Sequence, residues 1–183
     1  MHRKCPVQLV LYFLQIIARF VSAMKKTLFF ILLSLLCACG TLRQTPEEKR
    51  HIAEEVAKRL DAREYRIEVD YMSPVRGAGR AVSGGYSVTV DGNVVNSYLP
   101  YEGVAYNIPY GGGKGLIFKD GIVEYTDRGW SRGARVIVFS TNNGEDSIEY
   151  TLTIFDNGSA DIHVRCRIRD SISYRGTLVT GDK

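Results

Sequence analysis

The chain has 183 residues, 45% of them hydrophobic and 24% charged, which suits one domain of ordinary size. Five of its 24 basic residues, but none of its 20 acidic residues, lie within the first 38 positions, which we expect to be removed as a leader. The remaining chain would carry a formal charge of −1. A nucleic-acid-binding domain is usually clearly basic, so we expect no nucleic-acid partner.

The expected leader consists of a short basic segment followed by an apolar one. Met24–Lys26 precede the apolar run Thr27–Ala38, which is typical of a secretory signal. The run is shorter than the ~20 residues that a membrane-spanning helix needs. It ends in Leu36-Cys37-Ala38-Cys39, which resembles the lipobox of bacterial lipoproteins, where a lipid is attached to the last cysteine and the chain is cleaved before it. We therefore expect Cys39 to be the lipidated N-terminus of the mature protein.

The lipid on Cys39 would hold the protein on a membrane of the cell envelope. Gly40 follows this cysteine, whereas an aspartate at this position would suggest retention in the inner membrane. The absence of that aspartate favours the outer membrane, with the domain facing the periplasm. The expected organisation is a signal region at 1–38, a lipidated tether at 39–44 and one β-rich domain at 45–183. Residues 1–23 precede a signal that is already complete, so we interpret them as an over-extended start.

Cysteine and histidine are scarce in the expected mature chain. Only Cys166 remains as a free thiol, so no disulfide can form within one chain. The two remaining histidines, His51 and His163, have no cysteine at a spacing that suits zinc. We therefore expect neither a bound metal nor another cofactor.

The mature domain is expected to begin with one amphipathic helix that ends near Ala62. Thr45 is the expected N-cap, Pro46 fits the first turn, and Glu48 completes a capping box. Apolar side chains recur at helical spacing along one face: Ile52, Ala53, Val56, Ala57 and Leu60. The opposite face carries both signs of charge, whereas an interfacial membrane helix would need a strongly basic one. We therefore expect the helix to pack against a sheet.

Beyond the helix the hydrophobic period changes to two, which predicts strands. The predicted strands are Tyr65–Tyr71, Tyr86–Val90, Val94–Leu99, Leu116–Lys119, Ile122–Thr126, Ala134–Thr141, Ser147–Phe155, Ala160–Ile168 and Ile172–Val179. Short turns join most of them, including a turn at Asp120-Gly121. About eight antiparallel strands with one apolar face predict a mainly β fold, a meander that forms a lipocalin-like barrel or a strongly curved sheet, with one N-terminal α-helix.

The strand register of one hairpin, formed by the predicted strands Ser147–Phe155 and Ala160–Ile168, can be predicted from the sequence. Even-numbered residues face inward on both of its strands, so the numbers of opposed residues must sum to an even value. A three-residue loop, Asp156–Gly158 with Gly158 left-handed, meets this condition and places Ile154 opposite Ala160.

This register predicts where two reactive side chains lie. Cys166 faces the core, where it serves as a small apolar residue. His163 faces outward, so a buried catalytic triad through it is not expected. The other charged residues predicted on the outer face are Asp161, Arg165, Arg167 and Arg169. This arginine row is either a partner surface or an ordinary solvated face.

The longest predicted connection lies within Ser97–Phe118 and is the candidate functional site. The residues expected to bind a ligand or partner are Tyr98, Tyr101, Tyr106, Tyr110, Gly111, Gly112, Gly113 and Lys114. Loops of this length in compact domains are usually functional or disordered, and disordered segments are poor in aromatic residues. We therefore expect an ordered loop that closes one end of the barrel.

The glycine run Gly111–Gly113 does not have the spacing of either of two nucleotide-binding motifs. A Walker A loop needs Gly-x-x-x-x-Gly-Lys-Ser/Thr, but Ile108 stands at its first position and Gly115 at its last. A dinucleotide fingerprint needs Gly-x-Gly-x-x-Gly, but its last position is Leu116. An anion held by the glycine amides beside Lys114 stays an open alternative to the loop that closes the barrel.

Three runs of the sequence, YLPYEGVAYNIPYGGGKGL, LTIFDNGSADIHV and ISYRG, resemble a family of bacterial envelope lipoproteins known as domain of unknown function 4251. The resemblance extends from about Tyr65 to Leu178. It implies a compact β-rich domain and an envelope location. It implies no activity, because the family is named for having none assigned.

Three functions can be compared on this basis. The barrel interior would bind a small or lipidic ligand through a mouth formed by the tyrosine loop, which is the function that we expect first. Alternatively, the domain is a structural or protein-interaction module of the envelope with a filled barrel. A hydrolase is suggested only by the Gly-x-Ser-x-Gly spacing of Gly129–Gly133, but a strand rather than a helix follows it. We therefore interpret that segment as a turn and expect no enzyme.

Overall fold

The computed structural model describes residues 45–106 and 115–181, which belong to one compact unit, Thr45–Lys183. The expected signal region and the lipidation site Cys39 lie outside the described residues. So do five of the expected site residues, Tyr110, Gly111, Gly112, Gly113 and Lys114. Within the described ranges, no helix is long and apolar enough to cross a membrane.

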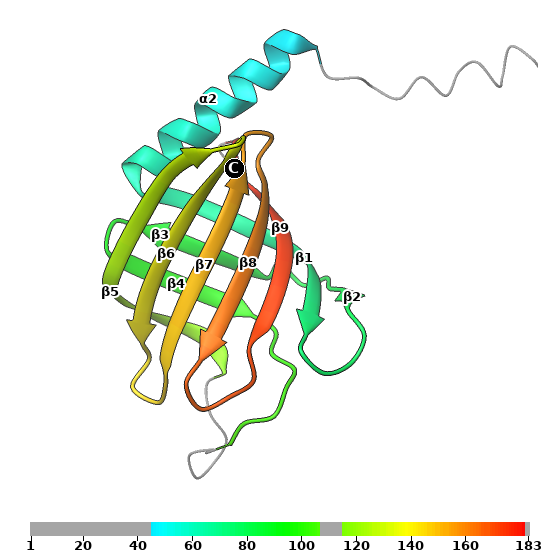
Figure 1. Cartoon of the computed structure of the whole chain (residues 1–183), viewed down its shortest axis with the longest axis vertical. Coiled ribbons are helices and arrows are strands. Elements are labelled where there is room, and N and C mark those ends of the chain that lie inside the picture. Colours follow the sequence, from blue (N-terminus) through cyan, green and yellow to red (C-terminus); the bar gives the residue numbers. More distant parts are fainter. Residues whose placement is uncertain (1–44, 107–114, 182–183) are drawn as a thin grey trace, which may run out of the picture. The chain divides into compact units, whose positions relative to one another are not determined.

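The described chain forms one helix followed by nine strands (Figure 1). The helix is α2 (Pro46–Ala62). The strands are β1 (Glu64–Pro74), β2 (Arg80–Ala81), β3 (Ser87–Asp91), β4 (Val94–Leu99), β5 (Leu116–Ser131), β6 (Ala134–Asn142), β7 (Ser147–Phe155), β8 (Ser159–Cys166) and β9 (Ile172–Leu178).

Eight of these strands close into an antiparallel barrel in the order β1-β3-β4-β5-β6-β7-β8-β9, and β9 pairs back with β1. The short strand β2 adds to β1 outside this ring. Helix α2 lies at one end of the barrel, and the described part of the loop between β4 and β5 lies at the opposite end (Figure 1). The predicted mainly β fold, a barrel with one N-terminal helix, is therefore confirmed.

Helix α2 begins and ends as predicted. The hydroxyl of Thr45 accepts the N–H of Glu48 at 3.2 Å, and the Glu48 carboxylate accepts the N–H of Thr45 at 2.8 Å, which completes the capping box. Val56 and Leu60 are fully buried on the predicted apolar face. The helix therefore covers its end of the barrel with the side chains that its periodicity indicates.

A buried arginine fastens the C-terminal end of the helix to the barrel. Arg135 of β6 donates from Nε to both carboxylate oxygens of Asp127 on β5, at 3.1 and 3.0 Å. Its Nη1 donates to Asp61 of the helix at 2.6 Å. The Arg135 guanidinium holds the pKa of Asp127 below its usual range, so this carboxylate stays charged beside it.

The hairpin between β7 and β8 has the predicted register. Ile154 lies opposite Ala160, and the pairing continues without a shift to Cys166. Gly158 has a φ of 84°, the left-handed conformation that the three-residue loop requires. Cys166 is buried and His163 is exposed, as predicted.

The predicted turn at Asp120-Gly121 is wrong. Strand β5 continues through it, pairing with β4 as far as Gly121 and with β6 from Ile122 onward. Gly121 does not adopt the positive φ that a two-residue hairpin would require there. A glycine inside a strand can instead mark a bend, and here it lies where β5 passes from one partner strand to the other.

Strand β1 contains a bulge that its alternating sequence does not predict. The pairing with β9 shifts between Val69 and Tyr71, so Met72 rather than Tyr71 enters the core. Opposite this bulge, Gly176 of β9 packs so closely that an added Cβ would lie 2.0 Å from the carbonyl oxygen of Glu68. The bulge and the glycine form the seam that closes the barrel.

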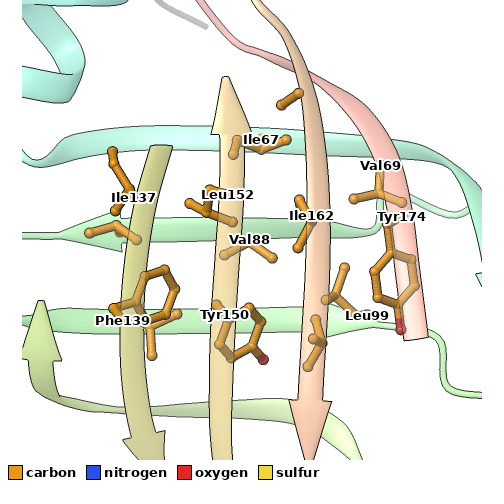
Figure 2. Close-up of a cluster of buried hydrophobic side chains, with 14 of the residues drawn as sticks. Ile67, Val69, Val88, Leu99, Ile137, Phe139, Tyr150, Leu152, Ile162 and Tyr174 are labelled. Carbon is orange, nitrogen blue, oxygen red and sulfur yellow. The ribbon is translucent and has the colours of Figure 1, made fainter. Parts of the chain in front are cut away.

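Apolar side chains from both walls fill the described barrel interior (Figure 2). A void large enough for water would leave accessible surface on the atoms that line it, but Phe139, Tyr150 and Leu152 are at most 1% exposed. The hydroxyl of Tyr150 donates to Ser97 at 2.9 Å, and Ser97 donates to the carbonyl of Leu116 at 2.8 Å. The interior is therefore a packed core in which this buried hydroxyl pair is satisfied.

Candidate functional site

The described part of the β4–β5 loop is joined by backbone hydrogen bonds to the segment between β8 and β9. The N–H of Tyr106 donates to the carbonyl of Ile168 at 2.8 Å, and the N–H of Asp170 donates to the carbonyl of Val104 at 2.9 Å. An isolated antiparallel bridge joins the same two segments. These contacts fix the path of the loop up to Tyr106 across this end of the barrel.

Asp170 is the centre of these contacts. Its carboxylate accepts the N–H of Val104 at 3.1 Å and the hydroxyl of Tyr106, and it pairs with Arg76 at 3.3 Å. Its backbone carbonyl accepts the hydroxyl of Tyr101 at 3.0 Å. The hydrogen bonds from Tyr106 and Val104 lower the pKa of Asp170, which favours the charged carboxylate. Segments from three parts of the chain therefore meet on one side chain.

The described tyrosines of the site divide into two roles. Tyr101 packs against the core, and burial raises its pKa to about 12. Gly103 lies so close that an added Cβ would be 2.6 Å from the Tyr101 hydroxyl. Tyr106 is 65% exposed although its hydroxyl is bound, and Tyr98 stacks on Tyr86 with ring centroids 5.3 Å apart and remains exposed. Tyr101 thus positions the loop, whereas Tyr98 and Tyr106 present ring surface to solvent.

Exposed apolar side chains gather at this end of the barrel. Of the seven large hydrophobic side chains that are exposed in the described ranges, five lie here, and we name them the loop-end surface: Val75, Tyr98, Val104, Tyr106 and Ile117. Val75 precedes Arg76, whose side chain reaches the Asp170 carboxylate that also binds Val104 and Tyr106. Tyr98 and Ile117 are opposed on β4 and β5 at the base of the loop.

A buried ion cluster lies next to the loop, where Arg169 forms a β-bridge with Ala105, and it corrects one prediction. Arg169 is not on the outer face but is 8% exposed, with Nη2 3.6 Å from Glu145 and Nε 3.6 Å from Asp146. The prediction failed because β8 ends at Cys166, and the alternation of faces stops there. The other two arginines of the predicted row, Arg165 and Arg167, are exposed as expected.

The Gly-x-Ser-x-Gly segment forms a hairpin. Ser131 ends β5, and the two-residue turn Arg132-Gly133, with φ of 53° and 79°, leads directly into β6. A nucleophile elbow would join a strand to a helix instead. The part of the chain that the structure describes also holds no group of three or more His, Cys, Asp or Glu side chains that could bind a metal ion.

Sequence reasoning located three described tyrosines of the site but missed Asp170 and Arg76. The sequence shows only that each of these two residues lies between two predicted strands. Their separation along the chain does not indicate that their side chains are in contact. The barrel topology brings their two connections to the same end. The glycine run and Lys114 lie outside the described residues, so the anion-binding alternative for them stays a prediction.

The fold and this end surface define a class of protein: a closed eight-stranded antiparallel barrel with a helix at one end and a tyrosine-bearing loop at the other. A family model described as Domain of unknown function (DUF4251) matches residues 47–178, so the chain belongs to this family and the resemblance seen in the sequence is confirmed.

A solved relative supports the same fold. The chain is similar to the crystal structure of a DUF4251 family protein from Bacteroides eggerthii DSM 20697, with 17% sequence identity and a TM-score of 0.55. The match covers 71% of this chain and 88% of that one. No curated protein matches the chain significantly.

Proposed function

We propose that the protein is a lipoprotein of the bacterial cell envelope whose packed barrel presents the loop-end surface to another envelope protein. One observation carries this proposal: five of the seven exposed large hydrophobic side chains in the described ranges lie at one end of the barrel. Grouped exposed apolar side chains mark interaction sites, whereas scattered ones need no explanation. Tyr106, held by its hydroxyl with its ring exposed, is the kind of aromatic side chain that dominates binding energy at interfaces.

The proposed anchor and the loop-end surface would lie at opposite ends of the domain. The lipid is proposed on Cys39, six residues before Thr45. An extended chain spans at most ~3.5 Å per residue, so the proposed lipid could lie at most about 20 Å from the helix start. Because α2 lies at the barrel end opposite the described part of the β4–β5 loop (Figure 1), anchoring there would direct the loop-end surface away from the membrane, into the periplasm for an outer-membrane anchor.

A small or lipidic ligand inside the barrel, the function expected first from sequence, has less support. Phe139, Tyr150 and Leu152, which would line such a cavity, are at most 1% exposed. A ligand would therefore have to displace packed side chains and forfeit the contacts that stabilise the core. We propose no catalytic role and no nucleic-acid partner.

The anchor is tested by the intact mass of the protein isolated from the membrane fraction. We expect a chain that begins at Cys39 and carries added acyl groups. Cys39→Ser should abolish both the acyl mass and the cleavage. A membrane-associated wild-type chain without acyl mass would contradict lipidation and would leave the loop-end surface to be tested separately.

The surface is tested by purifying the protein from envelopes treated with a chemical crosslinker. Tyr106→Ala combined with Val104→Ser should reduce the recovered partner about tenfold or more, because central interface residues typically contribute about 2 kcal/mol or more. Val123→Ser is the matched control, since Val123 is 72% exposed on β5 but is not part of the loop-end surface. Equal recovery from both variants would contradict the proposal.

A further inference from the structure

A second concave site lies on the outer face of the barrel, apart from the loop-end surface. A cavity of about 470 Å³ extends over β8, β9 and β1 and is lined by charged and hydroxyl-bearing side chains that include Asp70, Tyr71, Asp161 and Arg175. A neighbouring hollow of about 280 Å³ shares Asp161 and Arg175 with it. We name the two together the outer groove. The larger volume is within the ~300–1,000 Å³ typical of small-molecule sites.

The strand register arranges the groove side chains in a row. Thr153 of β7 is opposite Asp161 of β8, Asp161 is opposite Arg175 of β9, and Arg175 is opposite Tyr71 of β1. Tyr71 reaches this face only because the bulge in β1 shifts the register after Val69. Neighbouring strands lie ~4.8 Å apart, so the row spans about 14 Å.

The charged groups of the groove have unused binding capacity. The Arg175 guanidinium lies over the Tyr71 ring, 4.8 Å from its centroid. Within the described ranges, the carboxylates of Asp70 and Asp161 make no hydrogen bond or ion pair. Carboxylates are acceptors and a guanidinium is a planar set of donors, and hydrogen bonds to charged groups are the strong ones. The groove therefore offers strong acceptors and strong donors side by side.

We infer that the outer groove binds a neutral carbohydrate chain. Sugar hydroxyls both donate and accept, so they match the carboxylates, the guanidinium and the hydroxyls of Thr151, Thr153 and Ser173 that line it. Tyr71, whose ring carries the Arg175 guanidinium over one face, also lines the groove and provides a less polar surface for a sugar ring. The elongated row suits an oligosaccharide rather than a single sugar.

Other ligand classes fit the groove less well. An anionic ligand would meet the two unpaired carboxylates, and a cationic ligand would meet Arg175. A peptide bound by strand addition needs an open strand edge. Here β8 and β9 are paired on both sides, and β1 is paired with β9 and β2 at Tyr71. A neutral chain of hydroxyl groups meets neither obstacle.

Calorimetric titration of the full chain in detergent with neutral pentasaccharides tests this inference. The probes are β-1,4-linked N-acetylglucosamine, β-1,4-linked glucose, α-1,4-linked glucose and α-linked mannose, with pentagalacturonate and pentalysine as charged comparisons. We expect at least one neutral probe to bind more tightly than either charged one. Asp161→Ala and Arg175→Ala should each weaken that binding about tenfold or more, because each removes a hydrogen-bonding charge.

Matched variants separate binding from folding. Arg165→Ala removes another exposed arginine of the same outer face, whose ion pair with Glu149 lies outside the groove, and should leave binding unchanged. Arg175→Lys retains the charge but loses the planar donor set, and should weaken binding without changing the thermal midpoint. The inference is overturned if no neutral probe binds at millimolar concentration, if a charged probe binds more tightly, or if binding survives both alanine substitutions. None of these outcomes depends on the loop-end surface.

Discussion

Replacing Gly176 with alanine should open the seam that closes the barrel. The added Cβ would lie 2.0 Å from the carbonyl oxygen of Glu68 and 3.1 Å from Cα of Val69. Comfortable contact needs about 3.5 Å, so β1 and β9 would have to separate by more than about 1 Å. Overpacking typically costs about 1–3 kcal/mol, and because the clash here is with backbone, we expect about 3 kcal/mol. That is a large part of the ~5–15 kcal/mol that stabilises a typical domain.

The assay is thermal unfolding of the full chain in detergent, followed by circular dichroism. A loss of about 3 kcal/mol should lower the midpoint by roughly 10 °C in a domain of this size. Gly121→Ala is the matched control, because an added Cβ there meets nothing within 4 Å. It should change the free energy of unfolding by less than about 0.5 kcal/mol. If the two variants unfold at the same temperature, β1 does not pack against β9 as described.

Three further predictions concern titratable groups. Because the pKa of Asp170 is lowered, its contacts stabilise the loop above the unfolded pKa and are lost as pH falls through the folded one. The hydrogen-exchange protection of the loop, taken relative to the intrinsic exchange rate at each pH, should therefore fall below about pH 4 in the wild type but not in Asp170→Asn. Arg135→Ala should lower the free energy of unfolding by about 2 kcal/mol in chemical denaturation, whereas Asp61→Asn, at a side chain 68% exposed, should cost less than about 1 kcal/mol. Burial raises the pKa of Cys166 to about 12, so mass spectrometry should find this thiol unalkylated until the protein unfolds.

Each of these has a contradicting result. A loss of protection in acid that persists in Asp170→Asn would assign the effect to another carboxylate. Equal losses from Arg135→Ala and Asp61→Asn would mean that the pair with the exposed Asp61, and not the bidentate pair with Asp127 on β5, accounts for the stabilisation by Arg135. Alkylation of Cys166 at pH 8 in the folded protein would show that its thiol is accessible.

Patterns within one or two neighbouring elements were predictable from the sequence. The capping box of α2 depends on residues three positions apart, and the β7–β8 register depends on a strict period of two with a glycine available for the left-handed position. Both were correct because local geometry alone decides them. The tyrosine loop was recognised as a distinct segment for the same reason: its composition is local.

Features that depend on distant partners were not predictable. The bulge in β1 occurs in its pairing with β9, about a hundred residues later, so alternation within β1 alone does not reveal that Met72 rather than Tyr71 enters the core. Asp120-Gly121 is a common turn signal, but the available partners on β4 and β6 keep the chain extended there. Asp170 gains its role only because closure of the barrel brings Arg76 and the tyrosine loop to the same end.

A photo-crosslinking phenylalanine analogue in place of Tyr106, incorporated in the protein's own cells, tests the loop-end surface most directly. The same analogue in place of Val123 provides a similarly exposed control outside the loop-end surface. We expect illumination to join the first variant to a specific envelope protein and the second variant not to capture it. If position 106 captures no protein, or both positions capture the same proteins equally, the loop-end surface is not the face that this barrel presents to a partner.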